Sequence, residues 1–208
     1  MFKVGSRLFT AAGPAAVKEL AGLGQGVFLD LKFHDIPSTV AGAVAAGAKL
    51  PGVRLMTLHA SGGSEMMEAA WRAIKGSSSP PKLLGVTILT SLNAAGLKQA
   101  GMGGPLARRA VRLAKLSQAS GMDGAVTSAH EAKAIRRACG RDFIILVPAV
   151  RPKWAAAGDQ ARVGTPAEAI RAGADYVVVG RPVTAARDPR EAATRILDEI
   201  DSALHSRV

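Results

Sequence analysis

Short apolar segments alternate with segments of helical spacing along the whole chain. Runs such as 27–29 (VFL) and 177–179 (VVV) are rich in β-branched and aromatic residues and predict buried strands. Residues 66–74 place their large apolar side chains on one helical face and predict a helix with a buried stripe. The predicted strands are 1–5, 27–32, 53–59, 83–89, 124–127, 143–147 and 176–179. The predicted helices are 14–23, 37–50, 66–74, 106–119, 129–138, 166–172 and 189–204, with 6–12 as a loop or a short helical turn.

Alternating apolar strands and helices indicate a parallel sheet covered by helices. No Gly-x-Gly-x-x-Gly follows an early strand, as a doubly wound dinucleotide-binding sheet would favour. Polar residues and glycines instead follow one strand after another, and a (β/α)8 TIM-type barrel gathers such strand ends on the face that carries its active site. These residues are Lys3, Asp30 and Lys32, His59, Thr90, Pro148 to Arg151, and Gly180 with Arg181. We therefore expect a barrel, with seven strands in this chain and a single domain over 1–208.

The stretch 28–39 (FLDLKFHDIPST) places two acids and a lysine where a strand gives way to a helix. Asp30 and Lys32 are two residues apart, so a regular strand would project them from the same face. Asp35 lies past the strand in the loop, and Pro37 suits the first turn of the next helix. In isolation, the same pattern also fits a helix cap at Asp35 and a surface ion pair of Asp30 with Lys32.

A second group of residues predicts an anion-binding site. Gly180 and Arg181 directly follow the last predicted strand. Glycine lets an anion approach the backbone, and the arginine fork matches phosphate oxygens. The loop 149–163 adds Arg151 and Gln160, and its length suggests a lid. Taken alone, the Gly-Arg-Pro tripeptide fits equally well a simple turn whose arginine is exposed to solvent and binds no phosphate.

Composition narrows the class of protein. The 208 residues are 48% hydrophobic, which suffices for a sizeable core. No apolar run approaches the ~20 residues of a membrane span and the N-terminus lacks a secretion signal, so we expect a soluble, cytoplasmic protein without a membrane partner. Cys139 is the single cysteine, and the four histidines show no metal-ligand spacing, so no metal site is predicted.

The formal net charge of +11 raises the question of a nucleic-acid partner. Against it, the basic residues are spread along predicted helices, as in 108–115, and only 4% of residues are aromatic. A basic surface that attracts a small phosphorylated anion explains the charge as well. We therefore predict no nucleic-acid partner.

In order and spacing, these motifs closely resemble those of the bacterial-type orotidine 5′-phosphate decarboxylase family. The resemblance covers essentially the whole chain, which makes it far more specific than any single motif. The matching stretches are Lys3-Val4-Gly5 with Leu8-Phe9-Thr10, Phe28 to Thr39, His59 to Gly63, Thr87 to Ser91, Pro148 to Gln160, and Gly180 to Thr184.

The resemblance implies decarboxylation of orotidine 5′-monophosphate (OMP) to uridine 5′-monophosphate (UMP) without a metal or organic cofactor. It implies that Lys3, Asp30, Lys32 and Asp35 form a charged array, with Lys32 as the proton donor to C6. It further implies an obligate homodimer, in which Asp35 and Thr39 reach the partner's site. Among the remaining residues, the resemblance assigns Thr90 to the base and assigns Pro148, Arg151, Gln160, Gly180 and Arg181 to substrate binding, mainly at the phosphate.

The chain departs from the family pattern in two places. Family members carry a further strand before Lys3 that ends in an aspartate contacting the ribose, and the present sequence begins after it. An incomplete barrel exposes strand edges, so we expect poor stability or altered packing. Ser38 stands where many relatives have asparagine, and this leaves the charged residues of the motif intact.

Three other functions compete with this one. A sugar-phosphate decarboxylase or aldolase of the same barrel group shares the Asp-x-Lys-x-x-Asp pattern but uses magnesium. A non-catalytic remnant would bind UMP without turning over OMP. A nucleic-acid binder would bind random duplex in a salt-dependent manner, and UMP would not compete. The context of His34 and the Ile36-Pro37 pair, with the 151–160 loop, favours the nucleotide decarboxylase.

Overall fold

The computed structural model describes residues 1–155 and 164–205. The chain divides into two compact units. Unit 1 consists of Met1–Thr87 and Leu113–Ala125, and unit 2 consists of Ile88–Arg112 and Val126–Val208. That the two units form one domain, as the sequence predicts, stays a prediction.

The described residues contain seven strands, as the hydrophobic pattern predicts. They are β1 (Phe2–Gly5), β2 (Val27–Phe33), β3 (Val53–His59), β4 (Lys82–Val86), β5 (Gly124–Val126), β6 (Ile144–Pro148) and β7 (Tyr176–Val178). The strand order in the sheet is that of the chain, from β1 to β7. The pairs β1–β2, β2–β3, β3–β4 and β6–β7 are parallel. Polar residues that follow successive strands are therefore gathered at the same edge within each unit.

The helices agree with the predicted segments, with a few additions. They are α1 (Ser6–Ala12), α2 (Pro14–Gly22), α3 (Pro37–Ala48), α4 (Gly63–Ile74), α5 (Ala94–Gln99), α6 (Leu106–Ala119), α7 (Ala129–Cys139), α8 (Pro166–Arg171), α9 (Arg181–Thr184) and α10 (Pro189–His205), with a 3₁₀ turn, η1 (Ala60–Gly62). The short helices α5 and α9 were not predicted. The strand predicted over 83–89 ends at Val86, because Val86 pairs with His59, the last residue of the neighbouring β3.

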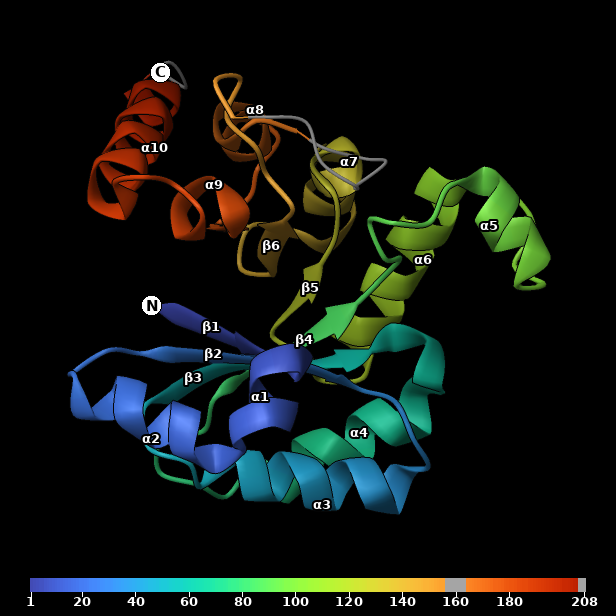
Figure 1. Cartoon of the computed structure of the whole chain (residues 1–208). Helices are drawn as coiled ribbons and strands as arrows, with labels where there is room; N and C mark the ends of the chain where they lie inside the picture. Colours follow the sequence, from blue (N-terminus) through green and yellow to red (C-terminus); the bar gives the residue numbers. More distant parts are fainter. Residues whose placement is uncertain (156–163, 206–208) are drawn as a thin grey trace. The chain divides into compact units, whose positions relative to one another are not determined.

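Unit 1 places its apolar core between the strands and three helices. Helices α2, α3 and α4 lie along one face of β1, β2 and β3 (Figure 1). Fully buried side chains from both layers, among them Leu29, Met56, Leu58 and Met67, fill this interface. The stripe of Met66, Met67, Ala70 and Ile74 predicted on α4 is buried, so this face of α4 forms part of the apolar core.

Unit 2 contains a polar hub, centred on Arg136, in the segments that precede β6 and β7. The Arg136 side chain, on α7, donates hydrogen bonds to backbone carbonyls and to the Asp175 carboxylate, at 2.6 Å. The carbonyl acceptors are those of Gly140, Arg141, Phe143 and Gly173. Asp175 also accepts from the Ile145 N–H of β6, so this hub fixes how α7 and the loop before β7 meet the sheet.

Across residues 1–155 and 164–205, no helix is both long and apolar enough to cross a membrane.

Candidate active site

Three of the charged residues predicted in unit 1, namely Lys3, Asp30 and Lys32, come together on β1 and β2. Lys32 Nζ lies 2.8 Å and Lys3 Nζ 3.4 Å from the same carboxylate oxygen, Oδ2 of Asp30. Asp30 is 7% exposed, so this is no solvated surface ion pair. A Cβ at Gly5 would lie 2.6 Å from Lys3 Nζ, so the glycine leaves room for that ammonium group. One buried carboxylate thus holds two cations side by side.

The strand that carries this array is irregular. Leu29 pairs with Met56 and Phe33 pairs with Leu58, so residues 30, 31 and 32 of β2 lie opposite only residue 57 of β3. Such extra residues bulge a strand and re-aim its side chains. Lys32 takes a left-handed backbone conformation, with φ of 52°. The sequence predicts correctly that Asp30 and Lys32 meet, but the cause is a bulge, whereas the prediction assumed a regular strand.

Thr57 is a member of this site that the sequence analysis missed. It is fully buried, and its hydroxyl donates to Asp30 Oδ1 at 2.9 Å while accepting from the Lys32 backbone N–H at 3.0 Å. The available signal was its position two residues before His59 in an otherwise apolar strand, which places both side chains on one face.

Asp35 and Thr39 line a pocket with Lys32. The pocket has a volume of about 300 Å³ and is lined by Leu31, Lys32, Phe33, His34, Asp35, Thr39, Val40 and Ala43. Asp35 is exposed, and its Oδ1 accepts from the N–H of Ile36, the residue that begins the turn into α3. No side chain caps α3, so Asp35 does not act as its helix cap. Its carboxylate is therefore presented at the surface beside Lys32.

Two of the histidines meet beside the array, which their sequence spacing did not predict. The rings of His34 and His59 lie 5.1 Å apart and are tilted relative to each other. Burial lowers the pKa of His59, and electrostatic interaction with His34 and Lys32 lowers it further. The negative charge of Asp30 raises this pKa, but by less than the other effects lower it. Neutral His59 therefore suits a site that already contains two ammonium groups.

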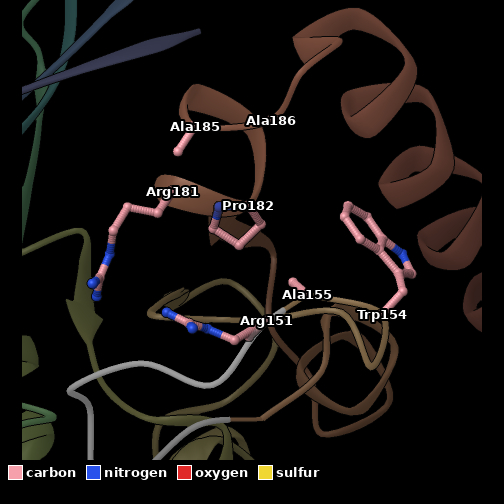
Figure 2. Close-up of a pocket in the computed structure, with 7 residues that line it drawn as sticks. All are labelled: Arg151, Trp154, Ala155, Arg181, Pro182, Ala185 and Ala186. Atoms are coloured by element: carbon pink, nitrogen blue, oxygen red, sulfur yellow. The ribbon is translucent and has the colours of Figure 1, made fainter.

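Unit 2 contains the predicted anion-binding arginines. Arg151 and Arg181 line a pocket of about 390 Å³ together with Trp154, Ala155, Pro182, Ala185 and Ala186. Figure 2 shows the two guanidinium groups extending to the same side of the pocket, whereas Trp154 stands at the opposite side. The Arg195 guanidinium lies 4.4 Å from the Trp154 ring centroid. Two converging arginine forks are suited to a phosphate group.

The other residues predicted in unit 2 lie at strand ends and turns. Pro148 ends β6, Gly180 precedes α9, and Thr90 is half-buried in the turn after β4. A Cβ built at Gly180 would meet nothing within 4 Å, so the backbone here faces open space.

Most of the predicted lid, 156–163, including Gln160, lies outside the described residues. The ends of this loop are joined, because the Arg151 N–H donates to the Gly164 carbonyl at 2.9 Å. Arg151 is therefore held at the base of the loop by its own backbone.

Comparison with known proteins points to one family. The model of the orotidine 5′-phosphate decarboxylase / HUMPS family matches residues 1–196. Orotidine 5′-phosphate decarboxylase of Trichlorobacter lovleyi is 56% identical over 96% of this chain and 84% of the relative, and that of Geobacter sulfurreducens is 54% identical over the same shares. The crystal structure of orotidine 5′-phosphate decarboxylase from Lactobacillus acidophilus matches with a TM-score of 0.83 and 39% identity, over 95% of this chain and 85% of that one.

Fold and site together define an α/β protein of the TIM-barrel class, with seven strands in the described residues and a lysine-rich charged array at the ends of its first strands. This confirms the predicted fold class. The chain belongs to the orotidine 5′-phosphate decarboxylase / HUMPS family, as the motifs in its sequence indicate.

Proposed function

We propose that this protein decarboxylates OMP to UMP, the last step of de novo pyrimidine nucleotide synthesis. The observation that carries the proposal is the array of Lys3, Asp30 and Lys32, in which one buried carboxylate holds two ammonium groups within 3.4 Å. The curated relatives that are 50–56% identical carry the name of this enzyme. We propose the cytoplasm as the place where it acts, the location expected from the sequence.

The array suits the chemistry of this reaction. When the C6 carboxylate leaves as carbon dioxide, the electron pair of the broken bond stays on C6, and a fixed cation nearby stabilises that developing charge. Lys32 then donates a proton from Nζ to C6. Asp30, placed against the substrate carboxylate, would repel it by about 4 kcal/mol at ~4 Å and an effective dielectric of ~20, and this repulsion ends as carbon dioxide departs. None of these steps assigns a role to a metal or an organic cofactor.

In the same proposal, Arg151 and Arg181 bind the phosphate, together with the backbone at Gly180 and the amide of Gln160. Thr90 contacts the base, and Pro148 also takes part in substrate binding. The pocket shared by the two arginines supports this assignment. Because the phosphate is remote from C6, its binding energy serves to position the reacting ring.

We further propose a homodimer in which Asp35 and Thr39 of each subunit complete the partner's site. Two observations support this arrangement: Asp35 and Thr39 are exposed, and they line one pocket with Lys32. Ile36, between them, is 64% exposed, which suits an apolar contact with a second copy.

The first experiment follows loss of the orotate chromophore from OMP, with chelator present, for the natural sequence and for Lys32→Ala. We expect turnover by the natural sequence and a loss of at least about 10³-fold in kcat for Lys32→Ala, because both the proton donor and a cation are removed. Affinity for UMP should change little. The matched control is Lys18→Ala, on the exposed side of α2, which should keep full activity.

Near-normal turnover by Lys32→Ala would contradict its role as proton donor. Activity that requires added magnesium and a sugar phosphate would favour the rival enzyme of the barrel group. UMP binding without any turnover would favour a binding protein.

Arg181→Ala tests the phosphate site. We expect the affinity for UMP to fall by about 10- to 100-fold, the value of a charge-assisted hydrogen bond, while the affinity for uridine stays the same. Titration calorimetry with both ligands measures this difference, and Arg171→Ala on α8 is an exposed control. Equal losses for UMP and uridine would place Arg181 away from the phosphate.

A further inference from the structure

The bulge in β2 takes the Lys32 backbone N–H out of the regular pairing between β2 and β3. Between the pairs Leu29–Met56 and Phe33–Leu58, three residues of β2 face one residue of β3, so regular ladder pairing is interrupted at Lys32. A buried or half-buried N–H needs a partner, because an unpaired one costs about as much as a lost hydrogen bond. The partner here is a side chain, the Thr57 hydroxyl, at 3.0 Å.

The same hydroxyl also holds the carboxylate of the array. Thr57 Oγ1 donates to Asp30 Oδ1 at 2.9 Å, while Asp30 Oδ2 lies 2.8 Å from Lys32 Nζ. The contacts form a closed ring that runs from the Lys32 N–H to Thr57, from Thr57 to Asp30, and from Asp30 to the Lys32 ammonium. A hydroxyl has one proton to donate and lone pairs to accept with, so threonine serves both partners at once.

We propose that Thr57 is a positioning residue for the reaction, acting through Lys32 and Asp30. A left-handed backbone conformation costs a residue other than glycine roughly 1–2 kcal/mol. The Thr57 hydroxyl stabilises this conformation at Lys32. It also fixes the rotation of the Asp30 carboxylate, so that Oδ2 faces the two ammonium groups. This inference rests on the proposed function, since it assigns a role within that reaction.

Full burial of Thr57 separates this role from substrate binding. The residue has no exposed surface, so it cannot contact a substrate bound beside Lys32. Removing its hydroxyl should therefore affect the placement of the reacting groups more than the affinity for the nucleotide. A placement error of about 1 Å can lower the rate about 10²-fold.

Thr57→Val keeps the shape of the side chain and deletes the hydroxyl, whereas Thr57→Ser keeps the hydroxyl. We expect Thr57→Val to lower kcat for OMP by about 10²-fold, with KM and UMP affinity changing far less, and Thr57→Ser to retain most of the natural kcat. The Lys32 amide proton should exchange faster in Thr57→Val than in the natural sequence. Ser117→Ala is the matched control, because it removes another buried hydroxyl of unit 1, one that donates to the Leu113 carbonyl within α6.

Several results would overturn the assignment. One is an unchanged kcat in a folded Thr57→Val, with the natural sequence active. Another is a loss in Thr57→Ser as large as that in Thr57→Val. If Thr57→Val does not fold, Thr57→Ala replaces it, and failure of both variants to fold would mean that the hydroxyl serves the fold instead of the reaction. Absence of turnover in the natural sequence would contradict the proposed function itself, whereas faster Lys32 exchange in Thr57→Val would still support the ring of contacts.

Discussion

At the residue scale, the array carries a net positive charge within one chain. Lys3 and Lys32 contribute two positive charges against the single negative charge of Asp30. An excess of positive charge favours an anionic substrate and the carbanion-like charge that forms when carbon dioxide leaves. In the proposed dimer, the partner's Asp35 would balance this charge, so the site would be neutral before the substrate enters.

His59 gives this part of the molecule a pH dependence of stability. Burial, His34 and Lys32 lower its pKa in the folded protein below the ordinary value of 6.5. Between those two pKa values, the unfolded chain binds a proton that the folded chain does not, so lowering the pH favours unfolding. His59 therefore contributes stability that is present above pH 6.5 and is lost as the pH falls through its folded pKa. Urea unfolding between about pH 7.5 and 5 should show a steeper loss for the natural sequence than for His59→Gln.

A second variant tests the cause of this shift. In His34→Gln, the ring contact at 5.1 Å is lost, and the pKa of His59, followed by NMR, should rise toward its ordinary value. Identical pH slopes for the natural sequence and His59→Gln would contradict the prediction.

At the element scale, the sequence predicts the strands and long helices well, because each has a clear hydrophobic period. The sequence prediction fails where a neighbouring strand determines the last residue of a strand. The strand β4 is an example, because it ends at the residue that pairs with the last residue of β3. The bulge in β2 was also out of reach, since nothing in the local sequence of 30–32 indicates a left-handed lysine. The hydroxyl that pairs with the Lys32 N–H in this bulge belongs to Thr57, 25 residues away in the chain. The contact between His34 and His59 likewise depends on strand register.

Arg136 links α7 to the segments that precede β6 and β7. Its side chain bonds to four carbonyls and to Asp175, so Arg136→Ala would leave several acceptors without this partner. We expect the free energy of unfolding to fall by roughly 2–3 kcal/mol, measured by urea denaturation. Arg136→Lys should recover only part of the loss, because an ammonium group lacks the planar fork. Exposed Arg137, next to it on α7, is the control, and a comparable loss in Arg137→Ala would contradict this explanation.

At the scale of the whole molecule, the charge of +11 has an explanation that needs no nucleic acid. Basic side chains on the surface raise the local concentration of a phosphorylated anion. Arg151 and Arg181 in their pocket, and Lys3 and Lys32 in the array, are then the places where such an anion would be bound.

The proposed homodimer can be tested by complementation. Lys32→Ala and Asp35→Asn should each be inactive alone, but after mixing and subunit exchange, a hybrid dimer contains one site with natural Lys32 and the natural Asp35 of its partner. We expect part of the natural activity to return. Mixing Lys32→Ala with Asp30→Asn is the control. Each subunit supplies both residues to its own site, so every site in this hybrid dimer has one substitution and no activity should return. Recovery in neither mixture, with exchange demonstrated, would argue against a shared site.

The left-handed backbone at Lys32 has a consequence for how such a protein would change over evolutionary time. Glycine and asparagine adopt this conformation more readily than lysine does, so the backbone itself favours replacing a residue that the proposed reaction requires. Selection for turnover and selection for stability therefore oppose each other at this one position. In a lineage that no longer needs the proposed reaction, relief of this backbone strain would favour substitutions at this position, offset in part by the loss of one ammonium partner of the buried Asp30 carboxylate.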